Sequence, residues 1–330
     1  MPSRSRHVIA VVARVPVLAA LALWAFAWPA SRVAARDLPL GVAGPPAATA
    51  QMERQLERHE GAFEIHRYAD EAAARDAIED RSVYGAVVVT PQGPELLTAS
   101  AAGPVVAQFL QQAVAQQAAA GGTQVKTADV VPAPAGDPRG AVLNTATLPL
   151  ALAGIAAGAV VTLLGLRGIR AVIALLGAST LVGGVAAGIA HSWLGALGGD
   201  WWAEAGVLGL STLAVGGAVA GLAALVGPAG TGIAAAVVML LGNPFSGATS
   251  APQMLPEPAG TIGQWLPPGA GTTLLRSVAY FDGAAATGPA LTLAWWAALG
   301  LGAVLLGAAL RARKAGTEPA AVRRELSPVG

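Results

Sequence analysis

The feature that most constrains the fold is a stretch of 166 residues, 145–310, in which only seven residues carry a full charge. A bilayer core about 30 Å thick needs roughly 20 apolar residues in a helix, and this stretch contains several runs of about that length. Soluble domains usually carry about 25% charged residues, so this part of the chain is predicted to lie in a membrane. The seven charged residues are Arg167, Arg170, Asp200, Glu204, Glu257, Arg276 and Asp282.

Six membrane spans are predicted, one at the N-terminus (residues 15–30) and five after residue 145. A cleaved signal peptide is the alternative for the first, because its apolar core is short and Ala25-Phe26-Ala27 resembles a cleavage site. The five later spans are residues 148–166, 171–197, 205–226, 229–241 and 289–310, of which 229–241 is short for a full crossing. Three glycine pairs in the spans, four residues apart, predict close helix packing. They are Gly154 and Gly158, Gly184 and Gly188, and Gly217 and Gly221.

Basic residues orient the spans by the positive-inside rule. Several arginines precede the first span, and Arg167 and Arg170 form the connection between the second and third. The connection between the third and fourth spans is acidic and carries paired Trp, which is typical of the outer interface. We therefore expect both termini in the cytoplasm, including the basic tail 311–330, and residues 37–144 outside. Two arginines directly after the first span are the one contrary sign.

Residues 37–144 are polar, with seven Lys/Arg against thirteen Asp/Glu, a net charge of −6. Their patterning predicts the order β-α-β-α-β-β-α-β, with a buried strand at residues 83–90. This is an α/β or α+β domain of normal size. With residues 1–36 as the N-terminus and first span, the chain is predicted to be a polytopic α-helical membrane protein with an extracytoplasmic domain between the first and second helices.

Patterns that carry catalysis or bind metals are scarce. The chain has no Cys, no P-loop motif, no G-x-S-x-G and no H-E-x-x-H, so we expect no enzymatic activity, no cofactor and no nucleic-acid partner. His59 and His66 lie beside Glu60 and Glu64, but no ligand spacing recurs, and surface residues are favoured over a metal site. Among titratable residues, only His191 falls within a predicted span. It is predicted to pack at the interface rather than to relay protons, which argues against an ion-coupled pump.

The segment before the last span, residues 242–288, is too rich in Pro and Gly for a long helix and too apolar for a solvated loop. Short helices are expected at 261–266 and 272–281, joined at Pro267-Pro268-Gly269, which predicts a re-entrant or interfacial hairpin. A plain surface loop is the alternative. The candidate functional residues in this segment are Asn243, Pro244, Trp265, Pro267, Pro268, Gly269, Arg276, Tyr280, Phe281 and Asp282.

Five short motifs stand out: Asp129-Val-Val-Pro132, Asp137-Pro-Arg-Gly140, Gly242-Asn-Pro-Phe-Ser-Gly247, Trp265-Leu-Pro-Pro-Gly269 and Arg276-Ser-Val-Ala-Tyr-Phe281. With the order of spans and polar domain, they resemble the phage-infection-protein-like (YhgE/Pip) membrane proteins, which are similar to type-2 ABC exporter permeases. Two Lys against eighteen Arg are typical of a GC-rich bacterial genome, which favours a bacterial plasma membrane.

The resemblance implies a six-span permease half that forms a homodimer, or a heterodimer with a second permease half, and moves an unidentified substrate. A separate ABC ATPase would supply the energy and would face the loop containing Arg167 and Arg170. Because that loop is about one helical turn long, coupling is expected to use the span ends or the termini as well. The alternative is a non-transporting membrane-anchored receptor or assembly scaffold that acts through residues 37–144.

Overall fold

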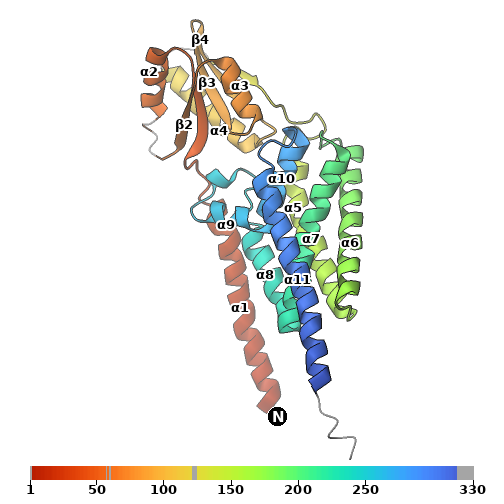
Figure 1. Ribbon diagram of the computed structural model, residues 1–330. Helices are drawn as coiled ribbons and strands as arrows, with labels where there is room; N and C mark the ends of the chain where they lie inside the picture. The colour runs from red at the N-terminus through yellow and green to blue at the C-terminus, as the bar shows by residue number, and fades with distance from the viewer. Residues whose placement is uncertain (1, 57, 59–60, 121–124, 318–330) are drawn as a thin grey trace, which may run out of the picture.

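The computed structural model describes residues 2–56, 58, 61–120 and 125–317. His59 and the end of the basic tail, from residue 318, lie outside these residues. The structure is mostly helical, at 66%. A sheet domain lies at one end of a bundle of long helices, and both ends of the described chain lie at the opposite end of that bundle (Figure 1). We call that opposite end the far end.

The sheet domain contains one mixed sheet of five strands, β1 (Leu38–Ala43), β2 (Phe63–Tyr68), β3 (Gly85–Thr90), β4 (Gly93–Thr98) and β5 (Lys126–Asp129). Their order across the sheet is β2-β1-β3-β4-β5. β1 is parallel to both β2 and β3, β3 and β4 form an antiparallel hairpin, and β4 is parallel to β5. Three helices connect the strands: α2 (Pro46–Leu56), α3 (Glu71–Glu79) and α4 (Pro104–Ala120). The predicted order of strands and helices is confirmed.

Alternate residues of the strands build two cores, one on each face of the sheet. Val88 belongs to the core under α3, and Val87 belongs to the core under α2 and α4. Residues from a much later part of the chain complete both: Phe281 joins the first core, and Ala251 and Met254 join the second. Residues 37–144 alone therefore do not complete the hydrophobic cores of the sheet domain.

Five helices in the described residues are long and apolar enough to cross a membrane, as expected of a multi-pass helical membrane protein. α6 continues into the π-helical turn η1 (Gly188–Trp193) and ends there, four residues short of the predicted boundary, just before Gly195 with its φ of +59°. The five are α1 (Pro2–Ala30), α5 (Ala141–Leu163), α6 (Ile169–Ala187), α7 (Trp201–Val226) and α11 (Thr287–Thr317).

The remaining predicted span, residues 229–241, is a shorter helix. α8 (Pro228–Val237) continues into the π-helical turn η2 (Val238–Gly242). Together they contain 15 residues, about 22 Å of helix, which is less than the roughly 30 Å core of a bilayer. The six-span topology therefore stays a prediction.

α7 is the centre of the bundle, and α5, α6 and α11 pack against it. In its most apolar stretch of 18 residues, 67% of the residues are buried. Glycines allow these helices to approach one another closely. A Cβ on Gly158 would lie 2.6 Å from the Gly216 carbonyl oxygen, and one on Gly221 would lie 2.6 Å from the Gly300 oxygen. The prediction is wrong for Gly184 and Gly188. A Cβ on Gly188 would meet no atom within 4 Å and one on Gly184 would meet only the tip of the Trp201 ring, whereas Gly183 forms the close contact with α7.

α1 stands apart from the other long helices along most of its length (Figure 1), and only 11% of the residues in its most apolar stretch are buried. Its last turns reach the sheet-domain end of the bundle, where the Trp28 ring lies 6.2 Å from that of Phe245. The chain then continues as a backbone pairing, in which the Ala34 N–H donates to the Met254 carbonyl at 3.0 Å.

Residues 243–286, which we call the junction segment, lie between the sheet domain and the bundle. They contain the short helix η3 (Pro252–Met254), α9 (Ala259–Trp265) and α10 (Pro267–Tyr280). The prediction that Pro267-Pro268-Gly269 forms the turn is wrong. The turn is at Leu266, in extended conformation, and the two prolines start α10, because a helix's first turn tolerates their missing N–H groups. Eleven of the fourteen α10 residues are buried, so a plain surface loop is the wrong description of this helix.

Candidate functional site at the junction of sheet domain and bundle

α10 contacts both the sheet domain and the helical bundle. On one side, Leu274 and Leu275 pack with Leu208 of α7 and Leu293 of α11. At the end of the helix, Phe281 enters the core of the sheet domain. One buried helix therefore shares side chains with both parts of the molecule.

Arg81, which follows α3, ties the sheet domain to α10. It has a φ of +61°, a left-handed conformation that is uncommon outside glycine. Its guanidinium donates to the Thr273 carbonyl at 3.0 Å and to the Ser277 hydroxyl, and its Cζ lies 5.3 Å from the centroid of the Phe281 ring. Burial lowers the pKa of Arg81 to about 10, so it remains a cation at neutral pH.

Arg276 is the buried cation of α10, with 4% of its surface exposed. Its Nη2 donates to the Ala248 carbonyl at 3.0 Å, and no carboxylate of the described residues lies within ion-pair distance. Asp282, six residues later, is exposed and does not pair with it. Burial lowers the pKa of Arg276, while the nearby Tyr84 and Tyr280 act in the opposite direction. Arg276 thus lies in the interior of the junction and is not a solvated loop charge.

Two tyrosines carry the contacts of the junction into neighbouring segments. The Tyr84 hydroxyl donates to Gln253 Oε1 at 2.9 Å, which joins the residue directly before β3 to η3. The Tyr280 hydroxyl donates to the Ala196 carbonyl at 2.8 Å, which joins α10 to the connection between α6 and α7. Burial raises the pKa of both hydroxyls, so both remain hydrogen-bond donors at neutral pH.

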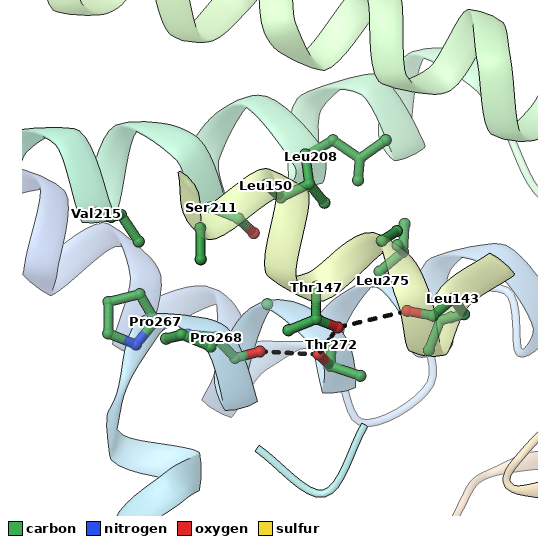
Figure 2. Close-up of a pocket in the computed structure, with 13 residues that line it drawn as sticks. Leu143, Thr147, Leu150, Leu208, Ser211, Val215, Pro267, Pro268, Thr272 and Leu275 are labelled. Atoms are coloured by element: carbon green, nitrogen blue, oxygen red, sulfur yellow. Dashed lines mark hydrogen bonds between the residues drawn. The ribbon is translucent and has the colours of Figure 1, made fainter. Parts of the chain in front are cut away.

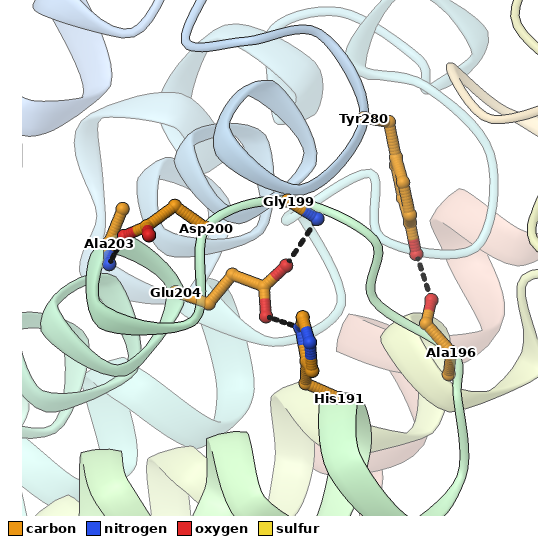
Figure 3. Close-up of polar contacts among 7 residues, drawn as sticks. All are labelled: His191, Ala196, Gly199, Asp200, Ala203, Glu204 and Tyr280. Atoms are coloured by element: carbon orange, nitrogen blue, oxygen red, sulfur yellow. Dashed lines mark hydrogen bonds and ion pairs between the residues drawn. The ribbon is translucent and has the colours of Figure 1, made fainter.

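The buried Glu204 and the half-buried His191 form a hydrogen-bonded pair beside this connection (Figure 3). Glu204 is 0% exposed; its Oε2 lies 2.8 Å from His191 Nδ1, and its Oε1 accepts the Gly199 N–H at 2.9 Å. The sequence placed Glu204 in the connection, but α7 already begins at Trp201, where Asp200 caps it by accepting the Ala203 N–H. His191 is therefore not the only titratable residue in the spans.

A small crevice opens between α5, α7 and α10 (Figure 2). The Thr147 and Thr272 hydroxyl oxygens are 3.3 Å apart in it, and Thr272 also donates to the Pro268 carbonyl at 2.8 Å. Its volume is about 30 Å³, room for only a few water molecules. A cavity of this size excludes a solute, so Pro267 and Pro268 line a packing defect between helices and not a substrate pocket.

The other predicted residues of the segment are divided between packing and exposure. Gly269 is required by close packing, because a Cβ there would lie 2.1 Å from the Gly263 carbonyl oxygen. Trp265 is 75% exposed, and its carbonyl accepts the Trp296 indole N–H at 2.8 Å. Asn243 and Pro244 are half-buried where η2 ends.

Arg167 lies in the α5–α6 connection, whereas Arg170, predicted to belong to it, lies in the first turn of α6. Both elements meet at the far end of the bundle (Figure 1), away from the junction. His66 lies on β2, with its Nε2 3.5 Å from Glu64, and no group of three or more metal-ligating side chains occurs in the described part of the chain. Comparison with protein-family models, curated proteins and solved structures finds no match for this chain. The resemblance to YhgE/Pip proteins therefore remains a prediction from the motifs.

Replacing Arg81 with Ala is expected to loosen the sheet domain from α10. Hydrogen bonds from a charged donor contribute about 1.5–3 kcal/mol, and the stacking on Phe281 is lost as well. Limited proteolysis of the purified chain should then cut in the junction segment at lower protease concentration. Arg75→Ala is the matched control, because Arg75 forms only a surface ion pair with Glu71. Equal protease sensitivity of the two variants would contradict the assignment.

Proposed function

We propose that this chain is the permease subunit of an ABC-type exporter, embedded in a bacterial plasma membrane and powered by a separate ATPase. The observation that carries the proposal is the position of α10, which packs against α7 and α11 while Arg81 and Phe281 hold it to the sheet domain. A shift of the long helices would therefore move the sheet domain with it. Such coupling between membrane helices and an external domain suits a transport cycle.

The passage for the substrate is proposed to form between two permease halves. Two crevices of the described bundle, one between α5, α7 and α10 and one between α5, α6, α7 and α11, have volumes of only about 30 and 80 Å³. The centre of the bundle is filled by α7, whose glycines admit close helix contacts. A second copy, or a related permease half, would supply the opposite wall.

The ATPase is proposed to contact the far end of the bundle. The connection between α5 and α6 has five residues and no helix of its own, so it offers little surface alone. α11 adds to it, because Arg311 near the end of this helix donates to the Ala224 carbonyl of α7. A push on α11 would be passed to α9 at its other end through Trp296 and the Trp265 carbonyl.

The test is to isolate the full-length chain from native membranes after mild cross-linking and to identify P-loop ATPases bound to it. Reconstitution of that ATPase with the chain is expected to raise ATP turnover, and charge reversal of Arg167 and Arg170 to Glu is expected to abolish the increase. The matched control is charge reversal of Arg139, which is exposed at the sheet-domain end.

A scaffold or receptor acting through the sheet domain is the second candidate, favoured by the short α5–α6 connection. It predicts that the chain binds no ATPase and that the charge-reversed variant still complements a deletion strain. An ATPase whose turnover depends on Arg167 and Arg170 would exclude it.

The orientation on which both functions depend can be measured with single cysteines, because the native chain has none. Gln92→Cys, in the exposed β3–β4 turn, is expected to react with a membrane-impermeant thiol reagent in intact cells. Arg167→Cys is expected to react only after the membrane is opened. Labelling of Arg167→Cys in intact cells would reverse the proposed topology.

A further inference from the structure

A crevice of about 80 Å³ opens at the far end of the bundle, between α5, α6, α7 and α11. Its walls are apolar, formed by Val161, Ala171, Ala220 and Val304 among others, and two arginines line it, Arg167 and Arg311. Arg167 comes from the α5–α6 connection and Arg311 from α11, so the two guanidinium groups reach the crevice from different elements.

Backbone geometry positions Arg167, and hydrogen bonds to backbone carbonyls hold Arg311. Gly165 and Gly168, with φ values of +67° and +55°, flank Arg167 and fold the connection into a tight turn. Arg311 donates through Nε to the Gly307 carbonyl at 3.3 Å and through Nη2 to the Ala224 carbonyl at the end of α7. A guanidinium has five N–H donors, so Arg311 keeps donors for a further acceptor.

The described chain offers no acidic group to these cations. Between residues 141 and 317 the described carboxylates are Asp200, Glu204, Glu257 and Asp282, and each belongs to the junction segment or to the start of α7 beside it. The far end thus presents arginines around an apolar crevice, at the depth where the membrane-crossing helices end. In a bilayer this is the level of the lipid headgroups.

We propose that this crevice binds the phosphate group of an anionic phospholipid. Two guanidinium groups match the geometry of phosphate oxygens, and basic pockets between membrane helices are a known mode of headgroup recognition. The apolar walls suit the glycerol backbone and the first acyl carbons. The inference does not depend on transport or on which side of the membrane the crevice faces.

The test uses the full-length chain in nanodiscs of phosphatidylcholine with increasing phosphatidylglycerol, and counts bound lipids by native mass spectrometry. Wild type is expected to retain phosphatidylglycerol selectively. Arg167→Gln/Arg311→Gln is expected to weaken this retention about thirtyfold, equivalent to about 2 kcal/mol for two arginines. The matched control is Arg170→Gln/Arg313→Gln, which removes the same charge from the same end, at positions that do not line the crevice. It is expected to weaken retention less than about fivefold.

Equal weakening in the two double variants would overturn the proposal in favour of diffuse surface charge. Arg167→Gln alone keeps the test valid if the Arg311 change impairs folding, because Arg167 makes no hydrogen bond in the described structure. Inorganic phosphate, added to the chain in pure phosphatidylcholine nanodiscs, distinguishes the source of the anion. It is expected to leave the melting temperature unchanged, and stabilisation equal to that by phosphatidylglycerol would also overturn the lipid proposal.

Discussion

A valine at Gly183 is expected to destabilise the helical bundle strongly, whereas a valine at Gly184 is expected to be tolerated. A Cβ on Gly183 would lie 2.3 Å from the Ala205 carbonyl oxygen and 2.7 Å from the Gly209 nitrogen of α7. These are backbone atoms of the most buried helix, so they cannot rotate away. The nearest atom to a Cβ on Gly184 is the tip of the Trp201 ring, at 4.0 Å.

The expected cost of Gly183→Val is about 3 kcal/mol or more, at the upper end for overpacked cores. Thermal unfolding of the two variants in the same detergent measures the difference. Because the residues are neighbours on one helix, the change in helix propensity is the same for both. Equal melting temperatures would contradict the packing of α6 against α7.

Glu204→Ala is expected to be the most destabilising change in the buried pair. It leaves the His191 imidazole and the Gly199 N–H without their shared acceptor, and each buried polar group left without a partner costs about 1–3 kcal/mol. Glu204→Gln keeps the length of the side chain and one acceptor oxygen, so it is expected to lose less stability. Protein yield and melting temperature in detergent measure both variants.

Asp200→Ala is the control for Glu204→Ala. Asp200 is also an acid at the start of α7, but it is exposed and only caps the helix, a contribution of about 1 kcal/mol. If Asp200→Ala proved as costly as Glu204→Ala, the buried pair would not be the source of the stability.

The sheet domain could be predicted closely because its signals are local. Strand alternation and the Asp70 cap of α3 lie within a few residues of the structure they specify. The position of Glu204 in α7 could also have been predicted from a local signal, because Asp200 is a good N-cap residue and Glu204 follows it within the first turn. Its pairing with His191 could not, because the two residues lie on different helices and no sequence period relates them.

The faces of the membrane helices were also beyond local patterns. α6 is apolar on all sides, so the sequence shows glycines four residues apart but not which side meets a neighbour. Close packing was predicted at Gly184 and Gly188, whereas α6 packs against α7 through Gly183. The burial of α10 was likewise hidden, because its partner Arg81 lies 192 and 196 residues before the two α10 residues to which it donates, Thr273 and Ser277.

Phe281, Ala251 and Met254 complete the cores of a domain whose last strand ends at Asp129. During synthesis the sheet domain emerges well before these residues, so its two hydrophobic faces must wait, partly uncovered, until the penultimate segment of the chain has been made. The contacts with these three later residues have a sequence separation of more than 100 residues, and contacts of long separation slow folding. The sheet domain can therefore complete its packing only after most of the membrane helices have been synthesised. A chain truncated before residue 250 would leave both faces of the sheet partly exposed, and we expect it to be sensitive to proteases.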